Sequence, residues 1–189
     1  MVWITNDKDR SPAELITVPK NAWGTLGGSL LNLSYGTGRA FIVPNEEVRG
    51  VWQGAVCELP MPAFATGIMR GRFSADGALY TCGMFAWAGN ATAPGGFHRI
   101  RRTEKPAQLP IAVHATKGAL TVTFSDPMVP PACSMKVWSL QRTKNYGSKH
   151  YDERELPIRA VKSSVDQRTL TFEVPDLTPT HCYELKIGD

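Results

Sequence analysis

Short runs of apolar residues, rich in β-branched and aromatic side chains, alternate along this chain with glycine, proline, asparagine and aspartate. Runs of this kind, bounded by turn-forming residues, are typical of β-strands. The 3.6-residue periodicity of amphipathic helices is scarce throughout the chain. The pattern therefore predicts an all-β protein.

The first part of the chain predicts two hairpins and further single strands. One turn is expected at Gly36-Thr37-Gly38 and another at Ala75-Asp76-Gly77, where an Asp-Gly pair between two strand-like runs is a strong hairpin signal. Residues 89–96 are expected to form a loop. The predicted strands cover residues 27–36, 39–43, 54–59, 69–74, 78–84 and 96–102.

The pattern changes after Glu104-Lys105-Pro106, where six short strands follow one another, the first two joined in a hairpin by a turn at Lys117-Gly118. Their spacing fits a β-sandwich of about 80 residues, similar to immunoglobulin or fibronectin type III modules. Pro175-Asp176-Leu177-Thr178-Pro179 resembles the corner before the last strand of fibronectin-like domains, in which the leucine fills the core. The predicted strands cover residues 111–116, 119–124, 135–140, 158–163, 169–174 and 182–187.

Longer motifs resemble a known family. The segment Arg70–Tyr80 is similar to the repeated blade strand of secreted β-propellers of the glucose/sorbosone dehydrogenase-like group. The wider pattern resembles the C-terminal portion of large exported proteins of planctomycete and verrucomicrobial type, from about residue 20 onward. It includes Gly28–Leu31, Gly95–Arg101, Trp138, Asn145–Ser148 and Pro175–Pro179.

This resemblance implies a propeller-blade-like antiparallel β segment at residues 1–105 and an immunoglobulin/fibronectin III-like sandwich at residues 106–189. It also implies an exported parent protein, periplasmic or extracellular. Members of the family are often labelled membrane-bound dehydrogenases or haem-binding proteins. This chain has no CxxCH haem module and no recognisable quinone or calcium site, so we expect no cofactor.

Composition and charge exclude several classes of protein. The chain has 189 residues, of which 42% are hydrophobic, which is near the globular norm and excludes a disordered chain. The net charge of +4 is spread over both halves, and neither half has the high density of lysine and arginine that nucleic-acid-binding proteins carry. No apolar run approaches the roughly 18 residues of a membrane span, and no apolar signal-peptide region follows the N-terminus.

The four cysteines are Cys57, Cys82, Cys133 and Cys182, and no CxxC motif is present. Four cysteines allow three pairings, which the sequence does not distinguish, and free buried thiols are the alternative. Because Cys133 and Cys182 border strands of the same predicted sandwich, we expect them to lie close together.

Motifs for catalysis or metal binding are missing. The four histidines have no HxH or HxxxH spacing, so no metal site is predicted. Neither a GxSxG elbow nor a glycine-rich phosphate loop occurs. We expect His98 to be a structural histidine and His114 to face solvent from a strand.

The best candidate ligand-binding segment runs from Arg142 to Glu155, because long loops on a rigid β scaffold often bind ligands. Its tyrosines would stack on sugars, and its charged groups would bind hydroxyls. The alternative is a solvated loop whose tyrosines cover the sandwich edge. Trp87 is expected either to be buried at the end of a blade or to line a ligand cleft. The predicted ligand-binding residues are Arg142, Tyr146, His150, Tyr151, Asp152 and Trp87.

Two functions remain open from the sequence. The first is a non-catalytic β module of an exported protein, acting in carbohydrate-associated binding or assembly. The second is a small hydrolase with an acid or histidine site between the two β units, and a glycosidase is preferred over an esterase. No spacing in the sequence singles out the pair of carboxylates that a glycosidase needs.

Self-association is also predicted, because residues 22–103 carry more apolar surface than one four-stranded sheet hides on a single face. A symmetric dimer would cover that surface. The residues concerned include Trp23, Leu30, Leu31, Phe41, Trp52, Phe64, Met69, Phe73, Leu79, Met84, Phe85 and Trp87.

Overall fold

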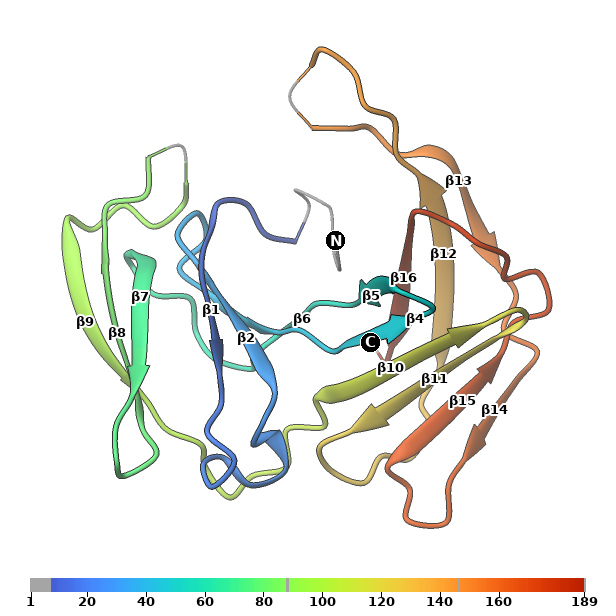
Figure 1. Cartoon of the computed structure of the whole chain (residues 1–189), viewed down its shortest axis with the longest axis horizontal. Coiled ribbons are helices and arrows are strands. Elements are labelled where there is room, and N and C mark those ends of the chain that lie inside the picture. The colour runs from blue at the N-terminus through green and yellow to red at the C-terminus, as the bar shows by residue number, and fades with distance from the viewer. Residues whose placement is uncertain (1–7, 88, 146, 189) are drawn as a thin grey trace.

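A computed structural model describes residues 8–87, 89–145 and 147–188. The described chain is all-β, apart from one short 3-10 helix at Gly24–Leu26. Figure 1 shows its small antiparallel sheets in two groups, with β1–β3 and β6–β9 on the left and centre and β10–β16 on the right, and with the β4–β5 hairpin beside β10. The prediction of an all-β protein is confirmed.

The first group contains two sheets that pack on each other. β7 lies against β1 and β2, so the two sheets enclose a common core that contains Leu31, Leu33, Ile68 and Leu79, all buried. One sheet has the order β1 (Pro12–Thr17), β2 (Leu30–Ser34), β3 (Ala40–Ile42) and β6 (Cys57–Glu58). The other is formed by β7 (Gly67–Phe73), β8 (Leu79–Met84) and β9 (Gly95–Ile100), and a separate hairpin by β4 (Asn45–Val48) and β5 (Val51–Gly54).

A glycine permits the close approach of these two sheets. Gly71 of β7 faces the core, and a Cβ atom at this position would lie 2.7 Å from Leu33 Cδ1 and 3.1 Å from Leu79 Cδ1. Normal carbon–carbon contacts are about 3.5–4.0 Å. The packing of β7 against β2 therefore depends on the missing side chain.

The second group contains two sheets that face each other across a second core. Alternate residues of β11 and β15, such as Leu120, Phe124 and Phe172, point inward and meet Met135 and Val137 of β12. One sheet has the order β10 (Pro110–Thr116), β11 (Ala119–Phe124), β15 (Thr169–Glu173) and β14 (Ala160–Ser163). The other has the order β13 (Tyr151–Leu156), β12 (Cys133–Ser139) and β16 (Cys182–Ile187).

Polar contacts hold the two groups together. The carboxylate of Asp126 accepts hydrogen bonds from the backbone amides of Ala107 (3.1 Å) and Gln108 (3.2 Å), and Arg102 lies 3.7 Å away. The Thr25 hydroxyl donates to the carbonyl of Ser125 at 2.9 Å. Burial opposes ionisation of Asp126, but these hydrogen bonds and that of Ser125 outweigh it, so its pKa is lowered.

The predicted hairpins are confirmed, with turns between β2 and β3, β7 and β8, and β10 and β11. Leu177 lies in the second core, as expected. The sequence missed four strands, β1, β4, β5 and β13, and the predicted strand at residues 54–59 is reduced to the two residues of β6.

The first group covers most of its own apolar side chains, which corrects the basis of the predicted dimer. The apolar residues of the first group are divided over two sheets that cover each other, and Leu31, Phe41 and Leu79 are buried without a second copy. The structure thus supplies much of the cover that the prediction assigned to a partner. The dimer itself stays a prediction.

The expected proximity of Cys133 and Cys182 is wrong. In the register of β12 and β16, Cys133 lies opposite Ile187 and Cys182 lies opposite Trp138. Five residue steps along a strand separate the two positions by about 17 Å. The two cysteines border the same pair of strands but lie at opposite ends of it, which forbids a disulfide between them.

Candidate functional site

The solvent side of β7, β8 and β9 gathers arginine and aromatic side chains. Strand alternation turns Tyr80, Cys82 and Met84 of β8 outward, whereas Leu79 and Thr81 point into the core. The register places these outward residues beside arginines on β7 and beside Phe97 and Arg99 on β9. We call this surface the arginine–aromatic face; it consists of Arg70, Arg72, Tyr80, Cys82, Met84, Phe97 and Arg99.

The rings of this face are ordered by cross-strand contacts. Tyr80 and Phe97 stack with 5.7 Å between their ring centroids and 27° between their planes. The guanidinium of Arg99 lies 5.6 Å from the centre of the Tyr80 ring. Phe97 is nevertheless 72% exposed, and Met84 is 50% exposed. The face therefore presents apolar side chains to solvent beside ordered arginines, and adjoining exposed apolar groups of this kind often mark an interaction site.

Carboxylates hold two of the arginines in place. Glu14 of β1 accepts from Arg72 at 2.7 Å and from the backbone amide of Gly71 at 2.7 Å. Burial opposes ionisation of Glu14, but these hydrogen bonds outweigh it and lower its pKa. Arg99 contacts Asp76 at 2.6 Å.

Asp76 stays ionised over the whole physiological range. The hydrogen bonds from the Ser74 hydroxyl and the Ala78 amide, together with Arg99, lower its pKa to about 2. The arginine–aromatic face thus offers fixed hydrogen-bond donors and acceptors beside exposed rings at neutral pH.

The prediction that Trp87 is buried is wrong. Its side chain is 72% exposed, and it follows β8 at one end of the arginine–aromatic face. The Tyr35 hydroxyl fixes this segment, because it donates to the Phe85 carbonyl at 2.7 Å and accepts from the Trp87 amide at 3.1 Å. The alternative role of Trp87, in ligand contact, stays a prediction.

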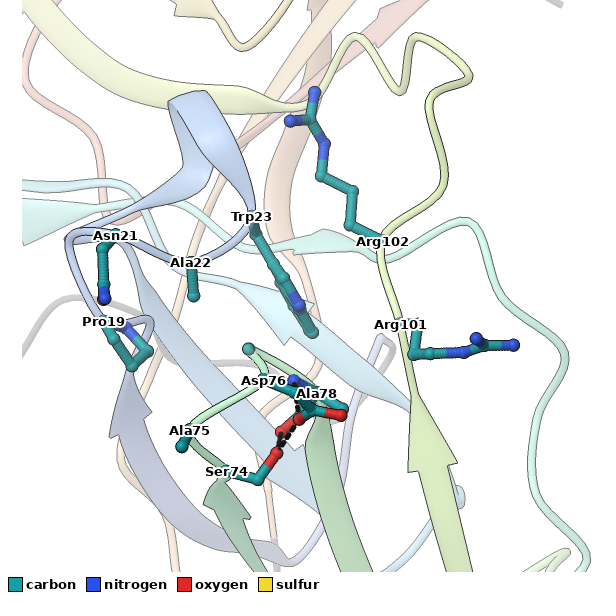
Figure 2. Close-up of a pocket in the computed structure, with 11 residues that line it drawn as sticks. Pro19, Asn21, Ala22, Trp23, Ser74, Ala75, Asp76, Ala78, Arg101 and Arg102 are labelled. Carbon is teal, nitrogen blue, oxygen red and sulfur yellow. Dashed lines mark hydrogen bonds between the residues drawn. The ribbon is translucent and has the colours of Figure 1, made fainter.

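A cavity of about 480 Å³ lies at the opposite end of the same sheet (Figure 2). The Trp23 indole extends toward the turn that contains Ser74 and Asp76, whereas Arg101 and Arg102 point away from it. Because the charged groups diverge, this cavity does not present a convergent binding site.

The predicted loop residues do not converge on one site. β13 begins at Tyr151, whose partner in the ladder is Ser139, so the loop ends earlier than expected. Arg142 and Asp152 are exposed, Tyr151 is half-buried, and Tyr146 lies outside the described residues. Trp87 follows β8 and so belongs to the other group of sheets, whose strand β8 lies far from β13 in Figure 1.

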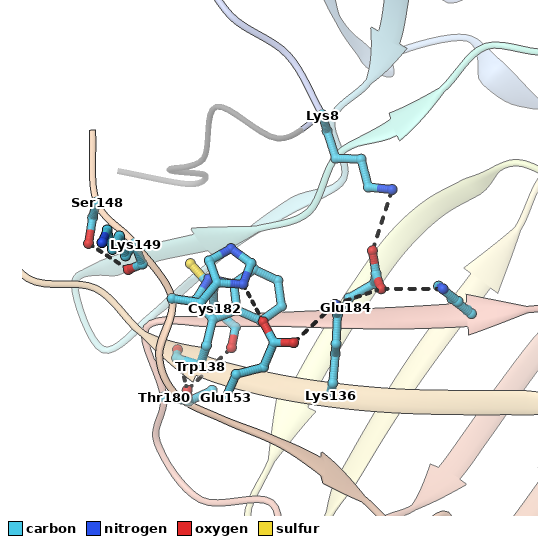
Figure 3. Close-up of polar contacts among 11 residues, drawn as sticks. Lys8, Lys136, Trp138, Ser148, Lys149, Glu153, Thr180, Cys182 and Glu184 are labelled. Carbon is cyan, nitrogen blue, oxygen red and sulfur yellow. Dashed lines mark hydrogen bonds and ion pairs between the residues drawn. The ribbon is translucent and has the colours of Figure 1, made fainter. Parts of the chain in front are cut away.

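Trp138, Lys136 and Glu153 belong to a cluster of charged and aromatic groups on the second group of sheets (Figure 3), and His150 contacts it. The His150 ring stacks on Trp138 at 4.2 Å between centroids and bonds to the carboxylate of Glu153. Lys136 lies 3.4 Å from Glu153 and 3.6 Å from Glu184. No local sequence signal indicates this cluster, because its members come from three strands and a loop. The ring of His150 covers Trp138, which is only 6% exposed, so this cluster has a packing role.

A groove of about 700 Å³ lies between the two groups of sheets, where the hydrolase alternative expected its site. His150 and His181 line it, together with apolar residues of β10, β11 and β16. Glycosidases need a carboxylic acid whose pKa is raised enough to donate a proton. Among the described residues, every carboxyl with a shifted pKa has it lowered: Glu14, Glu46, Asp76, Asp126, Glu153 and Asp166.

The other two predicted histidine roles can be compared with the structure directly. His98 stacks on Phe64 at 3.9 Å and lies 3.2 Å from the Thr66 hydroxyl, which confirms a structural role. His114 is exposed and contacts Glu46 at 2.7 Å. Within the described ranges, no group of three or more histidine, cysteine or acidic side chains is placed to hold a metal ion. No helix in the same ranges is long and apolar enough to cross a membrane.

Comparison of the chain with protein-family models, with curated proteins and with solved structures finds no match. The resemblance to the C-terminal portion of exported β-propeller proteins therefore stays a prediction from the motifs alone.

Proposed function

We propose that this chain is a non-catalytic carbohydrate-binding module that holds its ligand on the arginine–aromatic face. The observation that carries the proposal is the exposure of Phe97 and Met84 beside ordered arginines on one sheet. Sugar rings have flat apolar faces that pack on aromatic side chains, and their hydroxyls pair with guanidinium donors and carboxylate acceptors. Tyr80, Arg99 and Asp76 supply these groups next to Phe97.

Binding is favoured over hydrolysis by the state of the acids. A glycosidase would use one protonated and one ionised carboxyl across a cleft. The lowered pKa of Asp76 and Glu14 suits acceptors of hydroxyl hydrogen bonds rather than proton donors. The same property disfavours Glu153, the partner of the groove-lining His150, as a general acid, because the hydrogen bond from His150 and the charge of Lys136 lower its pKa.

The order of the sheets supports a modular, exported parent protein. The order β10-β11-β15-β14 corresponds to the A-B-E-D sheet of an immunoglobulin constant-type sandwich. The order β13-β12-β16 corresponds to C′-C-F, so the second sheet has an added strand beside C and no strand beyond F. We accordingly propose an immunoglobulin-like second module that follows a blade-like first one. Modules of this kind serve as spacers and binding units in exported proteins.

A glycan array followed by calorimetry tests the proposal. Phe97→Ala should weaken binding of the tightest array ligand about tenfold, which corresponds to about 1.4 kcal/mol. Trp52→Ala is the matched control, because Trp52 is an exposed aromatic residue on the separate β4–β5 hairpin. Tyr151→Ala tests the loop that the sequence favoured. Loss of binding in Tyr151→Ala with none in Phe97→Ala would move the site to the loop.

A second copy of the chain is the other occupant to consider for this face. Sedimentation of the wild type at low micromolar concentration reports it directly. A dimer that Phe97→Ala converts to monomer would contradict the carbohydrate proposal and support self-association.

A further inference from the structure

The arginine–aromatic face carries more positive than negative charge. Arg70, Arg72 and Arg99 belong to it, and two carboxylates contact these arginines: Glu14 pairs with Arg72, and Asp76 pairs with Arg99. Both carboxylates are ionised at neutral pH, because the pKa of each is lowered. Within the described part of the chain, one of the three positive charges therefore has no opposite charge in contact with it.

Arg70 is the arginine that lacks a carboxylate partner. In the described ranges its guanidinium forms no ion pair, and its one hydrogen bond goes to the Met69 carbonyl at 2.7 Å. It acts on Glu14 only through its charge. A guanidinium has five N–H donors, and the Arg70 side chain is exposed, so most of its donors are open to a ligand.

The register of the sheet places arginines and rings in two rows that run across the strands. Neighbouring strands lie about 4.8 Å apart, and successive outward residues of one strand lie about 7 Å apart. The guanidinium and the ring of one row are therefore close enough to contact the same sugar or two consecutive sugars. The rows are Arg72–Tyr80–Arg99 and Arg70–Cys82–Phe97.

The second row combines an unpaired arginine with the most exposed ring of the face. Phe97 is 72% exposed, and only the small side chain of Cys82 stands between it and Arg70. The planar fork of arginine donates two parallel hydrogen bonds to a carboxylate or another oxyanion. Such charge-assisted hydrogen bonds are roughly twice as strong as bonds between neutral groups. This row therefore favours a sugar that carries an anionic group over a neutral sugar.

We propose that the ligand of the arginine–aromatic face is an anionic glycan. Arg70 binds its carboxylate or sulfate group, and Phe97 packs on the apolar face of the sugar ring that carries this group. Arg72 and Arg99 are neutralised by their own carboxylates and bind neutral hydroxyls of the same chain. This inference rests on the proposed function, because it names the class of glycan that the same face takes.

Calorimetry with two matched pairs of polymers tests the inference. The first pair is polygalacturonate and its fully methyl-esterified form, and the second is dextran sulfate and dextran. We expect the anionic member of at least one pair to bind at least tenfold more tightly than its neutral counterpart, and the pair that shows this preference distinguishes a carboxylate from a sulfate. The preference should shrink in 0.5 M sodium chloride, because salt screens exposed charges.

Arg70→Gln should remove most of this preference and leave the weaker binding of the neutral polymer unchanged. Arg154→Gln is the matched control, because Arg154 is an exposed arginine on β13 of the second group. We expect Arg154→Gln to bind all four polymers as the wild type does. A single-stranded oligonucleotide of equal charge is a further arm, and we expect it to bind at least tenfold more weakly than the preferred polymer.

The outcomes separate this inference from the proposed function. If neutral and anionic polymers bind equally and Phe97→Ala weakens both, the face binds carbohydrate but the inference is overturned. A preference that Arg70→Gln retains, or tighter binding of the oligonucleotide, also overturns it. If no glycan binds, or if Phe97→Ala changes no binding, the proposed function and the inference fail together.

Discussion

Replacing Gly71 with alanine tests how closely the two sheets of the first group approach each other. The added Cβ would lie 2.7 Å from Leu33 Cδ1 and 3.1 Å from Leu79 Cδ1, and both leucines are fully buried. To reach a normal contact distance, one of these atoms must move by about 1 Å. Overpacking of this kind costs about 1–3 kcal/mol, which outweighs the gain of about 0.4–1 kcal/mol from a less flexible unfolded chain. We expect Gly71→Ala to lower the free energy of unfolding by about 1–2 kcal/mol.

Urea unfolding, followed by circular dichroism, measures this change. Gly95→Ala is the matched control in the same sheet, because its Cβ would have only the Gly83 carbonyl oxygen nearby, at 3.8 Å. We expect the control to stay within about 0.5 kcal/mol of the wild type. If Gly71→Ala were as stable as Gly95→Ala, the close approach of β7 to β2 would be refuted.

Three further predictions concern single groups. Because the pKa of Asp126 is lowered in the fold, its carboxylate stabilises the fold above about pH 4, and this contribution is lost as the pH falls. In acid unfolding, Asp126→Asn should therefore flatten the pH dependence of the free energy of unfolding below about pH 5. An unchanged slope would contradict the role given to this residue. Burial, and secondarily the charge of Glu46, raises the pKa of Tyr183 to about 12, so in ultraviolet titration Tyr183→Phe should remove the last phenol to ionise. The stability that Tyr183 contributes is present below about pH 10 and lost as the pH rises toward 12. Mass mapping after mild oxidation should find no disulfide between Cys133 and Cys182, and such a bridge would contradict the register of β12 and β16.

Strands with local signals were predictable, whereas strands that begin with proline or carry a run of charges were not. The Asp76-Gly77 and Lys117-Gly118 turns are local, and both glycines adopt positive φ, so the sequence indicated these hairpins directly. β1 begins with Pro12, which is tolerated at the start of an edge strand but reads as a break in the pattern. β13 carries four charged residues in a row, Asp152–Glu155, a composition that suits an edge strand and resembles a solvated loop.

The candidate site was only partly visible in the sequence. Alternation along residues 80–84 and 97–99 places Tyr80 and Phe97 on one side of their strands. The sequence does not tell which side of a sheet another sheet covers, because that depends on β1 and β2 packing against β7. The contact of His150 with Trp138 could not be predicted either. It joins the loop before β13 to β12, and the sequence pattern does not show how this loop folds over the strand.

The most direct test of the binding proposal is nuclear magnetic resonance of the isotopically labelled chain, titrated with the tightest ligand from the glycan array. The account predicts that shifted resonances gather on Leu79–Met84 and Gly95–Ile100, with the largest changes at Tyr80, Phe97 and Arg99. Shifts confined to residues 140–152 or to the groove beside β16, or no binding of any glycan at millimolar concentration, would contradict it.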